Sequence, residues 1–232
     1  MPFEWRQAGR LTSDGKPLAL APRAFPPAPV APPEFPPEAI AEDFEGLRPG
    51  DKCLFGSTHE EAGAGSARVS AEAAASGKHS LKFTDAPGKA FYNPHVTYTV
   101  GFTGGVARVG FDLRWESGAH FACEWRDYHV AGREFANGPA LQVGEDGALT
   151  SGGKRLAAIP AGQWVHVDLF CSLGGNAYDI ALRTPDGKTA RFDGLTFNSP
   201  FRRFDWCGLL ALKNGAAAFY LDNLVIEPDA KH

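Results

Sequence analysis

The densest group of side chains that could do chemistry lies in residues 106–128. Two runs of strict alternation flank the turn signal Glu116-Ser117-Gly118. A period of two predicts β-strands whose successive side chains point to opposite faces. We expect the two runs to be neighbouring strands. One face is apolar enough to be a core, so we expect a polar ligand to bind on the other. The ionisable residues on that other face are Asp112, Arg114, His120, Glu124 and Arg126.

These residue types suit the recognition of a saccharide. Sugars need polar groups that bind hydroxyls and aromatic platforms that cover their C–H faces. The ionisable side chains supply the polar groups, and Tyr92, Tyr128 and Trp164 are the candidate platforms. The alternative interpretation is a network of ion pairs on a solvated sheet. Each cross-strand pair of that kind contributes only about 0.2–1 kcal/mol.

Two catalytic interpretations use the same residues. Asp112 and Glu124 could be the paired carboxylates of a glycosidase, although the Glu-x-Asp-x-x-Glu strand motif of jelly-roll glucanases is absent. A polysaccharide lyase would need an arginine to neutralise a uronate carboxylate and a histidine or tyrosine to move the α-proton. One of the two arginines, with His120 and Tyr128, fits that requirement in residue type. The strand motifs of familiar alginate lyases are also absent, so binding is the favoured interpretation.

The rest of the chain predicts an all-β protein that can position such a face. The 27 glycines and 18 prolines indicate many turns. No window of useful length has helical periodicity, and many short strands separated by glycine-rich turns indicate a two-sheet antiparallel sandwich. The strands predicted from alternation are 68–71, 80–84, 95–100, 107–115, 119–126, 140–143, 164–171, 178–183, 189–192, 208–212 and 218–226.

The predicted domain organisation has four parts. Residues 22–37 contain eight prolines in sixteen positions, which predicts an extended polyproline linker over residues 22–39. Residues 1–21 are then an N-terminal arm or the remnant of an upstream domain. The sandwich domain is predicted over 40–228, with a C-terminal tail at 229–232. Such a linker implies an upstream domain as a tethered partner.

Three segments in order resemble jelly-roll domains attached to bacterial polysaccharide-degrading enzymes. They are Glu-Asp-Phe-Glu-Gly at 42–46, Ser-Gly-Lys-His-Ser-Leu-Lys at 76–82 and Tyr-Leu-Asp-Asn-Leu at 220–224. The Gly-Gln-Trp-Val-His-Val segment at 162–167 is similar to a strand of the laminin-G-like group. The resemblance covers about residues 40 to 226 and implies a concanavalin-like sandwich. It also implies that the first and last strands pair.

The same resemblance implies a structural calcium ion near that pairing. Carried over residue by residue, Glu45 and Asp222 supply carboxylates, and the carbonyl of Lys78 and the side chain of Asp43 lie beside them. Calcium takes six to eight oxygen ligands, so these groups are chemically suitable. The alternative is that the aspartates cap turns or pair with basic neighbours.

Bulk composition excludes some functions and leaves others open. A net charge of −4, a pI of about 6.0 and the lack of a basic stripe argue against nucleic-acid binding. No apolar run approaches the ~20 residues that span a membrane. The four cysteines form no Cys-x-x-Cys pair, which argues against a cysteine zinc site. A buried free thiol is favoured for Cys123, and a disulfide among the four stays open.

We therefore predict a non-catalytic accessory module that binds a polysaccharide or oligosaccharide on its concave sheet. The first alternative is a polysaccharide lyase or glycoside hydrolase acting on the same face. The second is a structural spacer or protein-interaction sandwich. The expected location is extracellular or periplasmic, with no export signal in this chain, because the resemblance and the linker suggest a piece of a longer exported protein.

Overall fold

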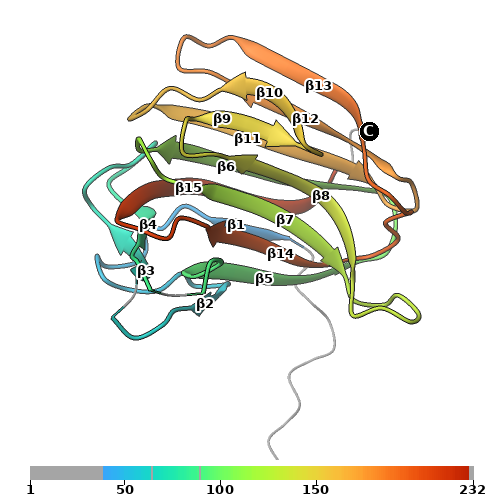
Figure 1. The fold of residues 1–232 in the computed structure, drawn as a ribbon, viewed down its shortest axis with the longest axis horizontal. Coiled ribbons are helices and arrows are strands. Elements are labelled where there is room, and N and C mark those ends of the chain that lie inside the picture. Colours follow the sequence, from blue (N-terminus) through green and yellow to red (C-terminus); the bar gives the residue numbers. More distant parts are fainter. Residues whose placement is uncertain (1–38, 64, 89, 230–232) are drawn as a thin grey trace, which may run out of the picture. The chain divides into compact units, whose positions relative to one another are not determined.

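The computed structural model describes residues 39–63, 65–88 and 90–229, and these form two antiparallel β-sheets with no helix (Figure 1). The predicted all-β, two-sheet sandwich is confirmed. The first strand begins at Ile40, where the sandwich domain was predicted to begin. The predicted arm, and the predicted linker up to residue 38, lie outside the described residues. Within those residues, no helix is long and apolar enough to cross a membrane.

The first sheet has eight strands, in the order β13-β12-β11-β6-β15-β4-β3, with β1 paired to β15 off this path. The pairing of β1 with β15 joins the first and last strands of the domain, as the resemblance implied. The bounds of these strands are β1 Ile40–Glu42, β3 Gly65–Ser70, β4 Ser80–Asp85, β6 Val106–Trp115, β11 Trp164–Ser172, β12 Ala177–Arg183, β13 Thr189–Thr196 and β15 Ala217–Asp229.

The second sheet has seven strands, in the order β10-β9-β8-β7-β14-β5-β2. In Figure 1, β14 runs between β7 and β5, although it comes after both of them and after six further strands in the chain. The bounds are β2 Ser57–His59, β5 His95–Phe102, β7 Phe121–Asp127, β8 Ala136–Val143, β9 Ala148–Ser151, β10 Lys154–Ala158 and β14 Phe204–Ala211.

Aromatic rings join the two sheets across the core. Phe111 on β6 contacts Phe121 on β7 edge to face, with ring centroids 5.6 Å apart. Phe121 also contacts Phe219 on β15 at 5.0 Å. Within the seven-stranded sheet, Trp125 on β7 stacks on Phe204 on the neighbouring β14, with ring centroids 4.1 Å apart. These rings are fully buried or nearly so, which confirms the apolar faces predicted from alternation.

The pairing predicted for residues 106–128 is wrong. The two alternating runs are β6 and β7, and they lie in different sheets instead of side by side. The turn at Glu116–Ala119 carries the chain from one sheet to the other, and the Trp115 indole N–H donates to the Ala119 carbonyl at 2.8 Å. Their apolar faces meet across the core, so their polar faces point away from each other.

All four cysteines are free and buried. Cys123 is fully buried on the inward side of β7, as predicted from its phase. Burial raises the pKa of the Cys171 thiol to about 12, so the thiol form dominates. The cysteines therefore act as small apolar core residues.

Candidate functional site

A cavity of about 270 Å³ opens on the outer face of the seven-stranded sheet. Residues on β7 that alternate with the core-facing Phe121, Cys123 and Trp125 form part of its wall. The cavity joins aromatic, amide and charged groups in one place. The lining residues are Phe91, Tyr92, His95, Ala122, Glu124, Arg126, Gln142, Trp206, Leu210 and Leu212.

Strand register explains how these side chains meet. Ala122 on β7 is opposite Gln142 on β8 and Leu210 on β14, and Leu210 is opposite His95 on β5. This row crosses four strands and puts the apolar side chains of Ala122 and Leu210 between two polar ones. Two rows away on the same face, beyond the pair of Glu124 and Gly208, Arg126 is opposite Trp206. The sheet therefore supplies an apolar floor with polar groups at its ends and an aromatic wall beside it.

Two larger and more open hollows lie elsewhere. One, of about 570 Å³, has no aromatic residue in its lining, and its Arg68 and Lys82 pair with Glu60 and Glu72. The other, of about 350 Å³, lies at β11 and β12. Only the smaller cavity combines several rings with an amide and an ion pair, so it is the better candidate for a ligand site.

Trp206 is a wall residue that the sequence reasoning did not select. Its six-membered ring occupies the space that a Cβ atom at Gly208, two residues along β14, would fill. Both residues lie on the outward phase, since Cys207 and Leu209 point into the core. The sequence signal for this wall residue is a large aromatic residue followed two positions later by a glycine, on a strand that is otherwise apolar. The glycine lets the ring lie along the strand.

Arg126 is held between two rings. Its guanidinium carbon lies 4.2 Å from the Trp206 ring centroid and 4.3 Å from that of Phe135. It also donates to the carboxylate of Glu124, two residues earlier on the same face. Its Nε is buried and makes no hydrogen bond to the described residues. These contacts fix the guanidinium against the tryptophan wall.

His95, which lines the cavity, is stacked on a second histidine. His95 stacks on His59 with centroids 4.4 Å apart, and Tyr92 contacts His95 edge to face at 5.7 Å. The Nδ1 of His95 donates to the side-chain oxygen of Asn93 at 2.7 Å. Burial, with the nearby His59 and Arg126 charges, lowers the pKa of His95 to about 4. The imidazole is therefore neutral at pH 7.

Five of the seven predicted ligand residues lie around this cavity. Tyr92, Glu124 and Arg126 line it directly. His120 lies beside it, with its Nε2 3.3 Å from the side-chain oxygen of Gln142. Tyr128, which is 41% exposed, contacts the Phe135 ring that covers Arg126.

The other two predicted ligand residues, Asp112 and Arg114, lie on β6 in the opposite sheet. Asp112 accepts hydrogen bonds from His166 at 2.8 Å and from Asn223 at 2.7 Å, and Arg114 pairs with Glu116. The prediction of one continuous charged face was wrong, because alternation does not specify which sheet a strand joins. Stacked sheets lie about 10 Å apart, and these two faces point in opposite directions. Asp112 and Glu124 therefore do not flank one glycosidic bond.

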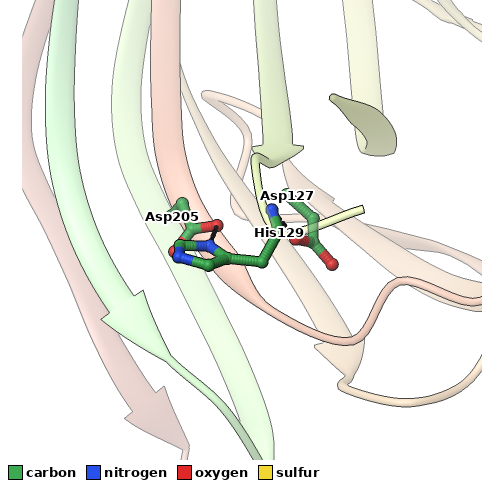
Figure 2. Close-up of side chains that lie close together, drawn as sticks. All are labelled: Asp127, His129 and Asp205. Carbon is green, nitrogen blue, oxygen red and sulfur yellow. Dashed lines mark hydrogen bonds and ion pairs between the residues drawn. The ribbon is translucent and has the colours of Figure 1, made fainter. Parts of the chain in front are cut away.

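Asp127, His129 and Asp205 form an acidic cluster at the end of β7, with potential ligand atoms all within 4.8 Å of one another (Figure 2). The His129 ring points toward Asp205, with Nδ1 2.9 Å from Oδ2. The same carboxylate oxygen accepts the backbone N–H of Tyr128 at 2.9 Å, and Arg203 pairs with the other oxygen. These contacts hold the start of the loop after β7, which carries Tyr128.

The carboxylates predicted to bind calcium accept backbone N–H groups in this structure. Asp222 is fully buried and accepts the backbone N–H groups of residues 75, 76 and 223 at 2.8–3.2 Å. Glu45 accepts the N–H groups of Lys78 and His79. Asp43 accepts the N–H of Glu45. Backbone amides therefore satisfy these carboxylates here, and a calcium ion beside them stays a prediction.

The pKa values of the two carboxyl groups differ in direction for physical reasons. Burial raises the pKa of Asp222, against its amide hydrogen bonds. The N–H groups of Lys78 and His79 lower the pKa of Glu45. Asp222 on β15 and Glu45 in the turn after β1 both hold the 75–79 loop. Their role in the structure is that of a clasp made of hydrogen bonds.

Comparison with known proteins establishes the fold. No protein-family model matches the chain, and no curated protein matches it in sequence. Among solved structures, a cellulose induced protein, Cip1, has a TM-score of 0.53 at 14% identity, covering 82% of this chain and 97% of that one. A carbohydrate esterase from the Shiga toxin-encoding bacteriophage phi24B has a TM-score of 0.51 at 15% identity, covering 75% and 90%. The lectin UEA-II, complexed with galactose, has 0.50 at 9% identity, covering 82% and 98%. The predicted jelly-roll sandwich is confirmed.

Proposed function

We propose that this domain binds a saccharide, without cleaving it, on the outer face of its seven-stranded sheet. The observation that carries the proposal is the meeting of Tyr92 and Trp206 with Glu124, Arg126 and Gln142 in one cavity. Aromatic rings can cover the C–H faces of a sugar, and the carboxylate and amide can bind its hydroxyls. Proteins of this fold that have carbohydrate-related names make a sugar the first ligand to test.

The composition of the cavity favours binding over hydrolysis. Glycosidases use two carboxyl groups about 5–9.5 Å apart. Among the described residues that line the cavity, Glu124 is the single carboxylate, and it is engaged by Arg126. The proposal therefore assigns Glu124 to the binding of hydroxyl groups and to the placement of Arg126.

A polysaccharide lyase is the second candidate. It is favoured by the presence of Arg126, His120 and Tyr128 on one side of one sheet. Against it, the neutral histidine that lines the cavity, His95, is partly buried, stacked on His59 and hydrogen-bonded to Asn93. Its pKa of about 4 makes it a weak base for removing an α-proton.

The proposed setting is a module of an extracellular or periplasmic polysaccharide-degrading system. The proline-rich composition of residues 22–37 supports a tether to an upstream domain. The experiment is retention on a panel of polysaccharides, together with assays for unsaturated products and new reducing ends. We expect retention without products. New products would replace the proposal with catalysis, and no retention on any polymer would favour a spacer or protein-interaction domain.

A further inference from the structure

The two full charges in the lining of the cavity belong to one ion pair. Arg126 and Glu124 are neighbours on the outer face of β7, and their side chains are 24% and 28% exposed. The other titratable groups of the lining are His95 and Tyr92. His95 is neutral at pH 7 because its pKa lies near 4. Lys213, which follows the lining residue Leu212, pairs with Glu145. Among the described residues that line the cavity, there is therefore no cation without a paired carboxylate.

The arginine is also restrained sterically. Trp206 and Phe135 both contact its guanidinium within 4.3 Å of their ring centroids, and the buried Nε faces no acceptor among the described residues. A guanidinium that binds a carboxylate in two-point geometry must present an edge with two N–H groups to it. Here one guanidinium N–H of Arg126 already donates to Glu124, and the rings of Trp206 and Phe135 restrain the orientation of the guanidinium plane.

We propose that the cavity selects uncharged saccharides, with Arg126 acting as a positioning residue for Trp206 and not as a ligand for a uronate carboxylate. The inference rests on the proposed function and names its substrate class. A uronate carboxylate entering this site would pay the free-energy cost of losing its hydrating water without gaining an unpaired cation in return. It would also be repelled by the carboxylate of Glu124. Uncharged hydroxyl groups can donate to Glu124 and to Gln142 without that cost.

Matched polymers test the inference. We would measure binding to galactan and polygalacturonate, to mannan and polymannuronate, and to β-1,4-glucan and β-1,4-glucuronan, at low and high sodium chloride. The expected result is stronger binding to an uncharged member than to its uronate counterpart, with little dependence on salt. Stronger binding to a uronate member that weakens in salt would overturn the inference and leave saccharide binding intact. Failure to bind any of the six would reject both proposals.

A charge-neutralising variant tests the ion pair itself. Glu124→Gln leaves Arg126 uncompensated, so we expect binding of the uronate member, relative to its uncharged counterpart, to rise about tenfold. Glu116→Gln is the matched control, since Glu116 pairs with Arg114 two residues away in the opposite sheet. A merely structural role for Glu124 would reduce both bindings together and leave their ratio unchanged, which would overturn the assignment. Circular dichroism and thermal melting establish that both variants are folded.

Discussion

The six-membered ring of Trp206 fills the space in which a Cβ atom at Gly208 would lie. The glycine therefore determines how the tryptophan is placed on the outer face of β14. Arg126, on the neighbouring strand, stacks on the same ring and completes the wall of the cavity. A binding site of this kind depends on a residue that has no side chain of its own.

Gly208→Ala tests this relationship. The added methyl group collides with the tryptophan ring and displaces it, so we expect saccharide affinity to fall about tenfold, or about 1.4 kcal/mol. Isothermal titration calorimetry with the retained polysaccharide measures the change. Gly104→Ala is the control, because a Cβ there meets nothing within 4 Å. Unchanged affinity in the Gly208 variant would show that the position of the ring is irrelevant to binding.

His166 predicts a pH-dependent contribution to stability in the opposite sheet. Hydrogen bonds to Asp112 and Asp168 raise the pKa of His166 to about 9, from an ordinary 6.5. Because the folded-state pKa is raised, the stabilisation is complete below pH 6.5 and is lost as the pH rises through about 9. At its full value it is on the order of 2–3 kcal/mol.

Urea unfolding of the wild type and of His166→Gln between pH 6 and pH 10 measures this contribution. We expect the difference in unfolding free energy to be largest near pH 6 and to shrink toward pH 10. The pKa of Asp168 is lowered, so the stabilisation that its carboxylate contributes is lost only as the pH falls below about 3.8, outside this range. A difference that is constant from pH 6 to pH 10 would mean that His166 is not held as a cation.

The clasp at Asp222 predicts stability without calcium. Asp222→Ala leaves three backbone N–H groups without their acceptor. Each hydrogen bond lost costs about 0.5–1.5 kcal/mol, so we expect a fall in melting temperature. For the wild type we expect the same melting temperature with a chelator as with added calcium chloride. A lower melting temperature with the chelator would restore calcium as a structural ion of this domain.

The sequence pattern predicted much of the fold because alternation reports burial directly. Each of the eleven predicted strands corresponds to an observed one, and the inward phases of β6 and β7 are as expected. The strands that were not predicted are β1, β2, β9 and β10, whose sequences do not alternate strictly between apolar and polar residues. The identity of partner strands was not predictable from alternation, which is why β6 and β7 were placed together.

The candidate site was predicted in part for the same reason. Glu124 and Arg126 stood out as charges on an alternating strand, and Tyr92 as an aromatic residue near a turn. Trp206 and His95 come from distant parts of the chain, and only the insertion of β14 between β7 and β5 brings them to the cavity. Such a site depends on strand order, which local sequence does not contain.

The central claim is tested most directly by comparing Trp206→Ala with Trp164→Ala. Both residues are tryptophans on outward strand positions, but Trp164 lies on β11 in the eight-stranded sheet. Calorimetric titration with the retained polysaccharide should show an affinity loss of about tenfold or more for Trp206→Ala, and less than about twofold for Trp164→Ala. Undiminished affinity in the folded Trp206 variant, or an equal loss in both, would contradict saccharide binding on this face.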